Sequence, residues 1–336
     1  MSAHRSFAML LLTACACGQV EDPGPRRLRV TTQPFLSHAP LLLADAEGYF
    51  AEQDIEVEFI RLADPAAGVP MLVDGGLDVL AGGVSPGVIN AMATGLTVRA
   101  VAEKGSLRQG TCSRHGLLIR RALLDRAAGG TPAVRRISLD RTPQQVYQVE
   151  RMLSSVGLKL ADLEQLFIPH LPEMTALAEG TLDAALAGEP WLTLNIDHDT
   201  TVTQWVRAED VLPDHQISFL YFGPNLMNDR DLGVRFMIAY IKAVRQFEEG
   251  RTPHNLELLS RITGEGADMI ERMCWPAFNA DGRIDFRGVN DFQAWALGRR
   301  LIETAVSEAT FWDATFVDAA TRVLEQTSDG APSESQ

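Results

Sequence analysis

The sequence is poor in cysteine and lysine: its 336 residues include four cysteines and three lysines. No CxxC pair and no Cys/His cluster is present, which argues against a zinc site. No basic patch interrupts the net charge of −14, so the chain lacks the features of a nucleic-acid-binding protein. What remains is a chain with 46% hydrophobic residues, long enough for two domains that each bury a core.

The amino terminus has the pattern of a targeting segment. A weak positive start precedes a short apolar run over residues 7–12, which is too short to span a bilayer as a mature helix. The run ends in Leu12-Thr13-Ala14-Cys15, which resembles the lipobox of bacterial lipoproteins. This resemblance implies a signal peptide over 1–14, a lipid on Cys15 and a flexible tether over 15–26. The alternative is an ordinary, unprocessed terminus.

Two further cysteines, Cys112 and Cys274, lie far apart in the sequence. An oxidising compartment would permit a bridge between them. Their spacing carries no information about proximity, so we expect two separately buried thiols.

One stretch of the chain occurs twice. Residues 71–86 read MLVDGGLDVLAGGVSP, and residues 176–190 read ALAEGTLDAALAGEP. In each copy a helix ends at a glycine, Gly75 or Gly180, which tolerates a left-handed cap. A short apolar run then predicts a buried strand, followed by a loop that opens a new helix near a proline. The two copies predict two similar lobes, unless two Gly/Ala-rich segments match by chance.

Strand and helix patterns alternate along most of the chain, which predicts an α/β protein with parallel pairing. Ser37 is a candidate cap for the first helix, and Thr142 with Gln145 has the spacing of a capping box. Residues 122–130 read as a break. The expected strands are 28–31, 55–60, 77–81, 97–102, 115–121, 134–140, 166–169, 182–187, 202–206 and 218–222. The clearest amphipathic helices are 143–156, 232–247, 255–262 and 289–304.

A family resemblance rests on three of these segments. Residues 38–59, HAPLLLADAEGYFAEQDIEVEF, together with DGGLDVLAGG and EGTLDAALAGEP, resemble the nitrate/sulfonate/thiamine-pyrimidine class of ABC-importer solute-binding proteins. The resemblance covers most of residues 28–225 and fades towards the carboxyl terminus. It implies a two-lobed type II periplasmic-binding-protein fold with two crossover strands. We therefore expect lobe I over 27–108 and 212–327, lobe II over 109–211, and a polar tail over 328–336.

Four loops at strand ends are expected to face the cleft, because ligands of open α/β sheets bind outside the carboxyl ends of the strands. Gly83 allows close approach to the backbone, Glu189 offers an acceptor, Trp191 a stacking surface and Arg141 a cation. Each also has an ordinary explanation as a cap, a packing residue or an exposed charge. The full candidate set is Thr32, Gln33, Phe35, Ser37, Gly82, Gly83, Ser85, Asp140, Arg141, Thr142, Glu189 and Trp191.

The resemblance implies an extracytoplasmic, monomeric binding protein that delivers a small molecule to an ABC permease and ATPase, without catalysis, cofactor or metal. Pyrimidine-precursor synthases resemble the same class, but their CCCFC motif is absent and the only lysines are Lys104, Lys159 and Lys242. Menaquinone-pathway dehydratases on this fold and a membrane-coupled ligand sensor are further alternatives. The ligand stays open between an oxyanion and an organic, partly aromatic molecule, with a slight preference for the latter because Phe35 and Trp191 flank the loops.

Overall fold

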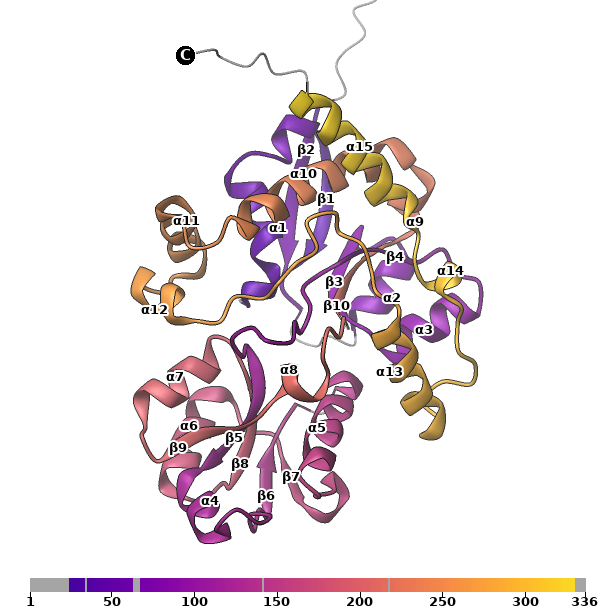
Figure 1. Ribbon diagram of the computed structural model, residues 1–336. Helices are drawn as coiled ribbons and strands as arrows, with labels where there is room; N and C mark the ends of the chain where they lie inside the picture. Colours follow the sequence, from indigo (N-terminus) through magenta and orange to yellow (C-terminus); the bar gives the residue numbers. More distant parts are fainter. Residues whose placement is uncertain (1–23, 34, 63–66, 141, 217, 330–336) are drawn as a thin grey trace, which may run out of the picture.

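The computed structural model describes residues 24–329 except 34, 63–66, 141 and 217. The expected lipidation site at Cys15 and the candidate Arg141 therefore lie outside the described residues. The chain forms two five-stranded sheets, each flanked by helices, and these make two lobes (Figure 1). The α/β, two-lobed fold predicted from the sequence is confirmed.

Lobe I is built on a sheet with strand order β2-β1-β3-β10-β4. All its strands are parallel except β10, which lies antiparallel between β3 and β4. The strands are β1 (Arg26–Thr31), β2 (Ile55–Ile60), β3 (Val79–Gly83), β4 (Arg99–Glu103) and β10 (Ser218–Phe222). The flanking helices are α1 (Ala39–Ala46), α2 (Gly68–Val73), α3 (Pro86–Ala93), α9 (Pro224–Asn228), α10 (Arg230–Glu248), α11 (Pro253–Thr263), α12 (Ala267–Arg272), α13 (Arg287–Gly298), α14 (Glu308–Phe311) and α15 (Thr315–Asp329), with 3-10 turns η1 (Leu36–His38) and η2 (Ala51–Gln53).

Lobe II repeats the pattern with the order β7-β6-β8-β5-β9. Here β5 is the antiparallel strand, between β8 and β9. The strands are β5 (His115–Arg120), β6 (Arg136–Ser138), β7 (Glu164–Leu166), β8 (Ala184–Gly188) and β9 (Val202–Arg207). The helices are α4 (Arg121–Ala127), α5 (Pro143–Ser155), α6 (His170–Glu179), α7 (Trp191–His198) and α8 (Ala208–Val211), with the 3-10 turn η4 (Leu160–Asp162).

The repeated stretch takes the same structure in both lobes. Gly75 and Gly180 have φ angles of 70° and 79°, and each ends a helix as expected. The shared aspartates then bind the neighbouring strand: Asp78 Oδ2 accepts from the backbone N–H of Arg29 at 2.6 Å, and Asp183 Oδ2 accepts from that of Arg136 at 3.0 Å. The aspartate shared by the two copies thus helps to hold β3 beside β1 and β8 beside β6.

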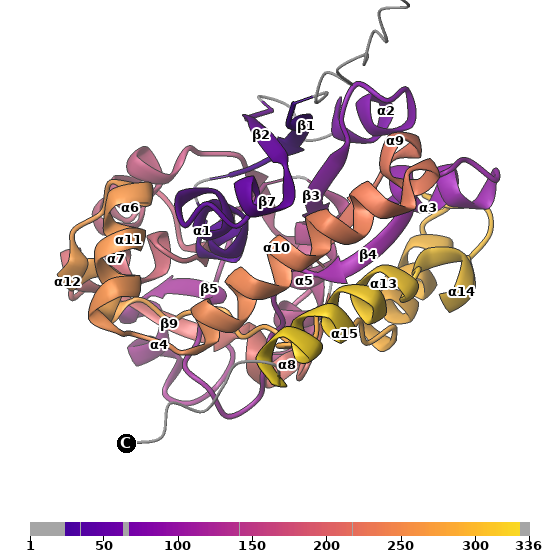
Figure 2. The ribbon, with the colours of Figure 1, turned by 90° about the horizontal axis from the view of Figure 1, so that it is seen from above.

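The core of lobe I is organised around α10, which buries one long apolar face. This helix packs against α1 and α15, and Figure 2 shows α10 and α15 running side by side. The carboxyl-terminal segment also contacts lobe II, because α13 packs against α5 through Phe292 and Trp295, whose rings meet Tyr147 at 5.6 Å. The helices that follow β10 therefore support both lobes.

Two sequence expectations about local structure are wrong. Residues 122–130, read as a break, contain most of α4, whose C-cap residue Ala128 has a φ of 46° and precedes two glycines. Ser37 does not cap α1, whose N-cap residue is His38 without a side-chain hydrogen bond. The tertiary structure satisfies Ser37 in another way, described below.

Candidate functional site

The carboxyl ends of the parallel strands of both lobes lie at the junction between the lobes. In lobe I this edge carries Gly83, which pairs with Ser218 at the start of β10. In lobe II it carries Gly188, which pairs with His115 at the start of β5. The two edges touch: a Cβ atom placed on Gly83 would lie 1.3 Å from Oε1 of Gln144 in α5. The Gly83 backbone is therefore in close contact with a side chain of the opposite lobe.

The first predicted loop follows β1. Thr32 is 3% exposed, and its Oγ1 has no hydrogen-bond partner among the described residues. Gln33 and Phe35 lie beside it, with Phe35 38% exposed. All three line a small cavity of about 30 Å³ against α11, which is room for one or two water molecules. Ser37 Oγ accepts a hydrogen bond from Lys104 Nζ at 3.1 Å.

The second loop leads from β3 into α3. Ser85 is the N-cap residue of this helix, and its Oγ accepts from the backbone N–H of Val88 at 3.3 Å. The hydroxyl thus fills the capping role that was weighed against ligand binding. Gly82 has only ordinary contacts, the nearest being Leu80 at 3.9 Å from an added Cβ. Of the two glycines, Gly83 alone is in contact with lobe II.

The third loop leads from β6 into α5, with Thr142 as N-cap residue and Pro143 in the first turn. The predicted capping box is not formed. The Thr142 side chain makes no cap hydrogen bond, and Gln145 Oε1 accepts instead from the backbone N–H of Asp140 at 3.1 Å. Asp140 Oδ1 in turn accepts from the Thr142 N–H at 3.2 Å. This turn uses one oxygen of the Asp140 carboxylate.

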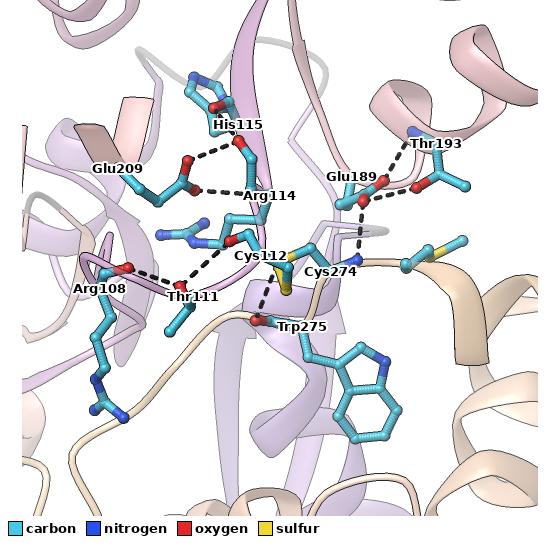
Figure 3. The surroundings of a disulfide bond; sticks show 12 residues. Arg108, Thr111, Cys112, Arg114, His115, Glu189, Thr193, Glu209, Cys274 and Trp275 are labelled. Atoms are coloured by element: carbon cyan, nitrogen blue, oxygen red, sulfur yellow. Dashed lines mark hydrogen bonds between the residues drawn. A yellow bond between two sulfur atoms is a disulfide. The ribbon is translucent and has the colours of Figure 1, made fainter. Parts of the chain in front are cut away.

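The fourth loop joins β8 to α7 and contains Glu189, which is 8% exposed. Glu189 Oε1 accepts from Thr193 Oγ1 at 2.8 Å and from the backbone N–H of Cys274 at 2.9 Å, and Oε2 accepts from the Thr193 N–H (Figure 3). Burial raises the pKa of the Glu189 carboxyl. Trp191 stacks on His170, with ring centroids 4.7 Å apart. Protein groups therefore hold both side chains.

Cys112 and Cys274 form a disulfide, so the expectation of separate thiols is wrong. Figure 3 shows the bridge between the first crossover, 104–114, and the loop after α12. The same loop supplies the N–H that Glu189 accepts, at the lobe II end of the junction. Sequence spacing could not reveal this pairing, because folding brings together residues 162 positions apart.

Three basic side chains at the junction were not among the candidate residues. Lys104 follows β4 directly and is 3% exposed. Burial, followed by the charge of Arg114, lowers the Lys104 pKa to about 7. Burial and the charge of Lys104 hold the His38 pKa well below its usual value, and burial with the Arg114 charge lowers the His115 pKa to about 4. Both imidazoles are neutral at pH 7.

Several polar atoms at this junction are buried without a hydrogen-bond partner among the described residues. They are Thr32 Oγ1 and His38 Nδ1 in lobe I, and Ser138 Oγ in lobe II. His115 Nε2 in lobe II makes no hydrogen bond of normal geometry, although the Gln148 side chain lies close enough to raise the pKa of this imidazole slightly against the effect of burial. Each lies at or just beyond the carboxyl edge of its sheet. Unpaired buried polar atoms are rare in folded proteins because desolvation costs about 1–3 kcal/mol each. The sequence contained one signal for this cluster, because Lys104 lies just after the expected strand 97–102.

The described residues contain no group of three or more His, Cys, Asp or Glu side chains that could hold a metal ion. Within the same residues, no helix combines the length and apolar character needed to cross a membrane.

Comparison with known proteins supports the fold. Residues 36–107 match the family model described as NMT1/THI5 like. No curated protein matches the chain by sequence. Comparison of three-dimensional structures finds similarity over a larger part of the chain.

Three solved structures illustrate this similarity. The ligand-binding component of an ABC-type import system from Staphylococcus aureus, with zinc bound, has a TM-score of 0.71 and 14% identity, covering 88% of this chain and 99% of that one. The desulfurization enzyme DSZB has a TM-score of 0.68 and 16% identity, covering 89% and 99%. A sulfonate ABC transporter's periplasmic sulfonate-binding protein from Methylobacillus flagellatus, itself described as putative, has a TM-score of 0.65 and 17% identity, covering 93% and 98%. The resemblance to the nitrate and sulfonate class is confirmed at the level of the fold.

Proposed function

We propose that the chain is an extracytoplasmic solute-binding protein that captures a small molecule between its lobes and delivers it to an ABC importer. One observation carries this proposal: both sheets direct their carboxyl edges at one junction, where polar atoms from both lobes are buried without partners among the residues that the structure describes. A ligand that hydrogen-bonds to these atoms would offset the free-energy cost of burying them without partners. Catalysis is not required for this role.

The proposed lobes are 27–108 with 212–327, and 109–211, joined by crossovers before β5 and after β9. Ligand binding would shift the population of lobe arrangements towards the closed one. The proposed ligand-facing residues are the four loops of the sequence analysis, with Lys104, His38, His115 and Ser138 added to them. Among the loop residues, Ser85 and Glu189 already have protein partners, so we assign them supporting roles.

The import role rests on the binding proteins that share this fold, and the lipid anchor rests on the sequence around Cys15. Together they support a proposed location outside the cytoplasm, with a tether to a membrane and with a permease and an ATPase as partners. A thermal-shift screen against pyrimidines, sulfonates, inorganic oxyanions and amino-acid-like compounds would identify the ligand. Adding the loaded protein to its permease and ATPase in proteoliposomes should then stimulate both ATP hydrolysis and ligand uptake. Ligand binding without either effect would instead favour a sensor.

An enzyme on the same fold is the second candidate, since DSZB shares it. Within the described residues both cysteines are in the disulfide, so no free thiol is available there as a nucleophile. Incubating each ligand found in the screen with the protein and analysing it by mass spectrometry separates the two functions. We expect to recover the ligand unchanged. A product formed in molar excess over the protein would establish an enzyme.

A further inference from the structure

The disulfide bond joins two segments that belong to different lobes (Figure 3). Cys112 lies two residues before Arg114, whose backbone N–H donates to Glu209 Oε1 of α8 at 3.0 Å. The Arg114 carbonyl oxygen accepts from the backbone N–H of Glu189 at 3.0 Å. β5 begins at the next residue, His115. A short stretch of chain therefore attaches Cys112 to the body of lobe II.

The other cysteine, Cys274, belongs to lobe I. It lies in the loop after α12, and this loop packs on α10, where the rings of Trp275 and Phe247 stack with their centroids 4.8 Å apart. Further along the loop, the Asn279 N–H donates to Glu103 Oε1, at the end of β4, at 2.6 Å. These contacts fix the loop to lobe I.

We propose that the Cys112–Cys274 bridge is a third covalent connection between the lobes, beside the two crossovers, and that it fixes one side of the junction as the pivot of lobe opening. Because the bridge keeps the two Cα atoms 5.6 Å apart, the loop after α12 stays beside Arg114 and Glu189 when the lobes move. A dithiol reductant breaks this connection and frees that side to open. The pivot rests on the proposed binding function for the movement of the lobes, and it adds the position about which they turn.

The contacts between the lobes differ on the two sides of the junction. Figures 1 and 2 place α12 with α7 on one side and α13 with α5 on the other. On the first side the Cys274 N–H donates to Glu189 Oε1 at 2.9 Å, and the disulfide adds a covalent bond. On the second side the lobes meet through ring contacts and through Trp295 Nε1, which donates to Glu150 Oε2 at 2.8 Å. Opening should therefore separate α13 from α5 while α12 turns in place beside α7.

The bridge can be reduced from the Cys112 side, because Cys112 is exposed whereas Cys274 is 5% exposed. One thiolate of a dithiol reductant attacks Cys112 Sγ, and Cys274 leaves as a thiolate that takes up a proton. The second thiol of the reductant then displaces Cys112, which is also protonated. Two electrons have passed to the protein, and the reductant ends as a disulfide. The two crossovers are then the remaining covalent connections between the lobes.

Small-angle scattering and residue-resolved amide exchange of the ligand-free protein, before and after reduction with dithiothreitol, test the pivot. Reduction should increase the radius of gyration and speed exchange of the Cys274 amide by at least about tenfold, the lower end of what a hydrogen bond to a charged group contributes. The Asn279 amide, bonded within lobe I, should not change. In the oxidised protein, the Trp295 indole N–H should be less protected than the Cys274 amide. Cys112→Ser/Cys274→Ser should behave like the reduced parent, with or without dithiothreitol.

Two variants that keep the disulfide separate its effect from that of the contacts around it. Glu189→Ala removes the acceptor of the Cys274 N–H, so this amide should exchange faster while the radius of gyration stays unchanged. Arg272→Ala removes an exposed ion pair between α12 and Asp197 of α7 and should change neither measurement. If circular dichroism shows that the reduced protein unfolds, the oxidised Glu189→Ala variant decides the question alone.

Three results would overturn the proposed pivot. One is a radius of gyration and a Cys274 amide exchange that reduction leaves unchanged. Another is an equal loss of protection at Cys274 and Asn279, because the bridge would then act on overall stability. The third is expansion of oxidised Glu189→Ala, which would assign the connection to the hydrogen bond instead. Since no ligand is involved, each result leaves the binding function standing, and that function is tested separately by the ligand screen and the analysis of ligand turnover.

Discussion

Replacing Gly83 tests whether the two lobes meet where the structure places them. An alanine Cβ at this position would lie 1.3 Å from Oε1, 2.4 Å from Cδ and 3.1 Å from Nε2 of Gln144. The whole carboxamide must move, but it is the end of a flexible, half-buried side chain. We therefore expect Gly83→Ala to cost about 1 kcal/mol of unfolding free energy, and Gly83→Val about 3 kcal/mol, the lower and upper ends of typical overpacking costs.

The matched control is Gly82→Ala, in the same strand. Its Cβ would meet only Leu80 at 3.9 Å, which is ordinary contact, so little change is expected. Shortening Gln144 should also rescue the variant. In the double variant Gly83→Ala/Gln144→Ala, we expect a coupling energy of about 1 kcal/mol, which restores the unfolding free energy lost in Gly83→Ala. This rescue distinguishes a side-chain clash from damage to β3.

Urea unfolding of the four variants measures the stability terms, and small-angle scattering shows whether the lobes separate to relieve the clash. Gly83→Ala should lose stability or become more extended, whereas Gly82→Ala should do neither. If the two single variants behave alike in both measurements, the contact between β3 and α5 does not exist in solution. If Gln144→Ala fails to restore Gly83→Ala, another residue is responsible and the reasoning is refuted.

Three further predictions follow from other parts of the chain. Reducing the Cys112–Cys274 bridge, which closes a loop of 162 residues, should lower the unfolding free energy by about 2–5 kcal/mol, while the same reductant leaves a Cys112→Ser/Cys274→Ser variant unchanged; equal effects on both proteins would contradict this. Cys15→Ser should abolish lipid labelling and membrane association in a bacterial host, and persistent labelling would rule out the proposed anchor. Trp191→Ala should lower the unfolding free energy by about 0.5–1.5 kcal/mol, because the stack on His170 is lost. If ligand affinity falls only as much as stability does, Trp191 is a packing residue rather than a ligand contact.

Local sequence signals were sufficient for much of the fold. The strands 55–60 and 218–222 have the bounds that alternation and turn residues suggested, and a helix begins at Pro86, where the repeated stretch predicted one. These predictions are correct because the local sequence pattern and the tertiary environment favour the same secondary structure. The helix Arg121–Ala127 was missed because seven residues are too few for a clear helical period, and the glycines that follow suggested a loop.

The candidate site was less accessible to sequence reasoning. Loops were located correctly from strand ends, but the side chains within them have partners that depend on distant segments. Ser37 accepts from Lys104, and Glu189 accepts from Cys274, 85 positions away. His38 and His115 were not in the candidate set, because a single histidine more often packs or caps. Only the burial of several unpartnered groups at one junction distinguishes them, and burial is a property of the folded chain.

The first crossover connects the proposed binding chemistry to the arrangement of the lobes. It begins at Lys104 and ends at Arg114, and the disulfide at Cys112, two residues before that end, joins it to the loop that contains Cys274. The same loop donates the Cys274 N–H to Glu189 of lobe II, so a movement that carries Glu189 away from this loop must break that hydrogen bond. A hydrogen bond to a charged group contributes about 1.5–3 kcal/mol, enough to favour the closed arrangement without making it permanent. Lys104, one of the proposed ligand-facing residues, lies at the start of the same crossover, so a ligand bound there would contact the segment that the disulfide joins to this loop.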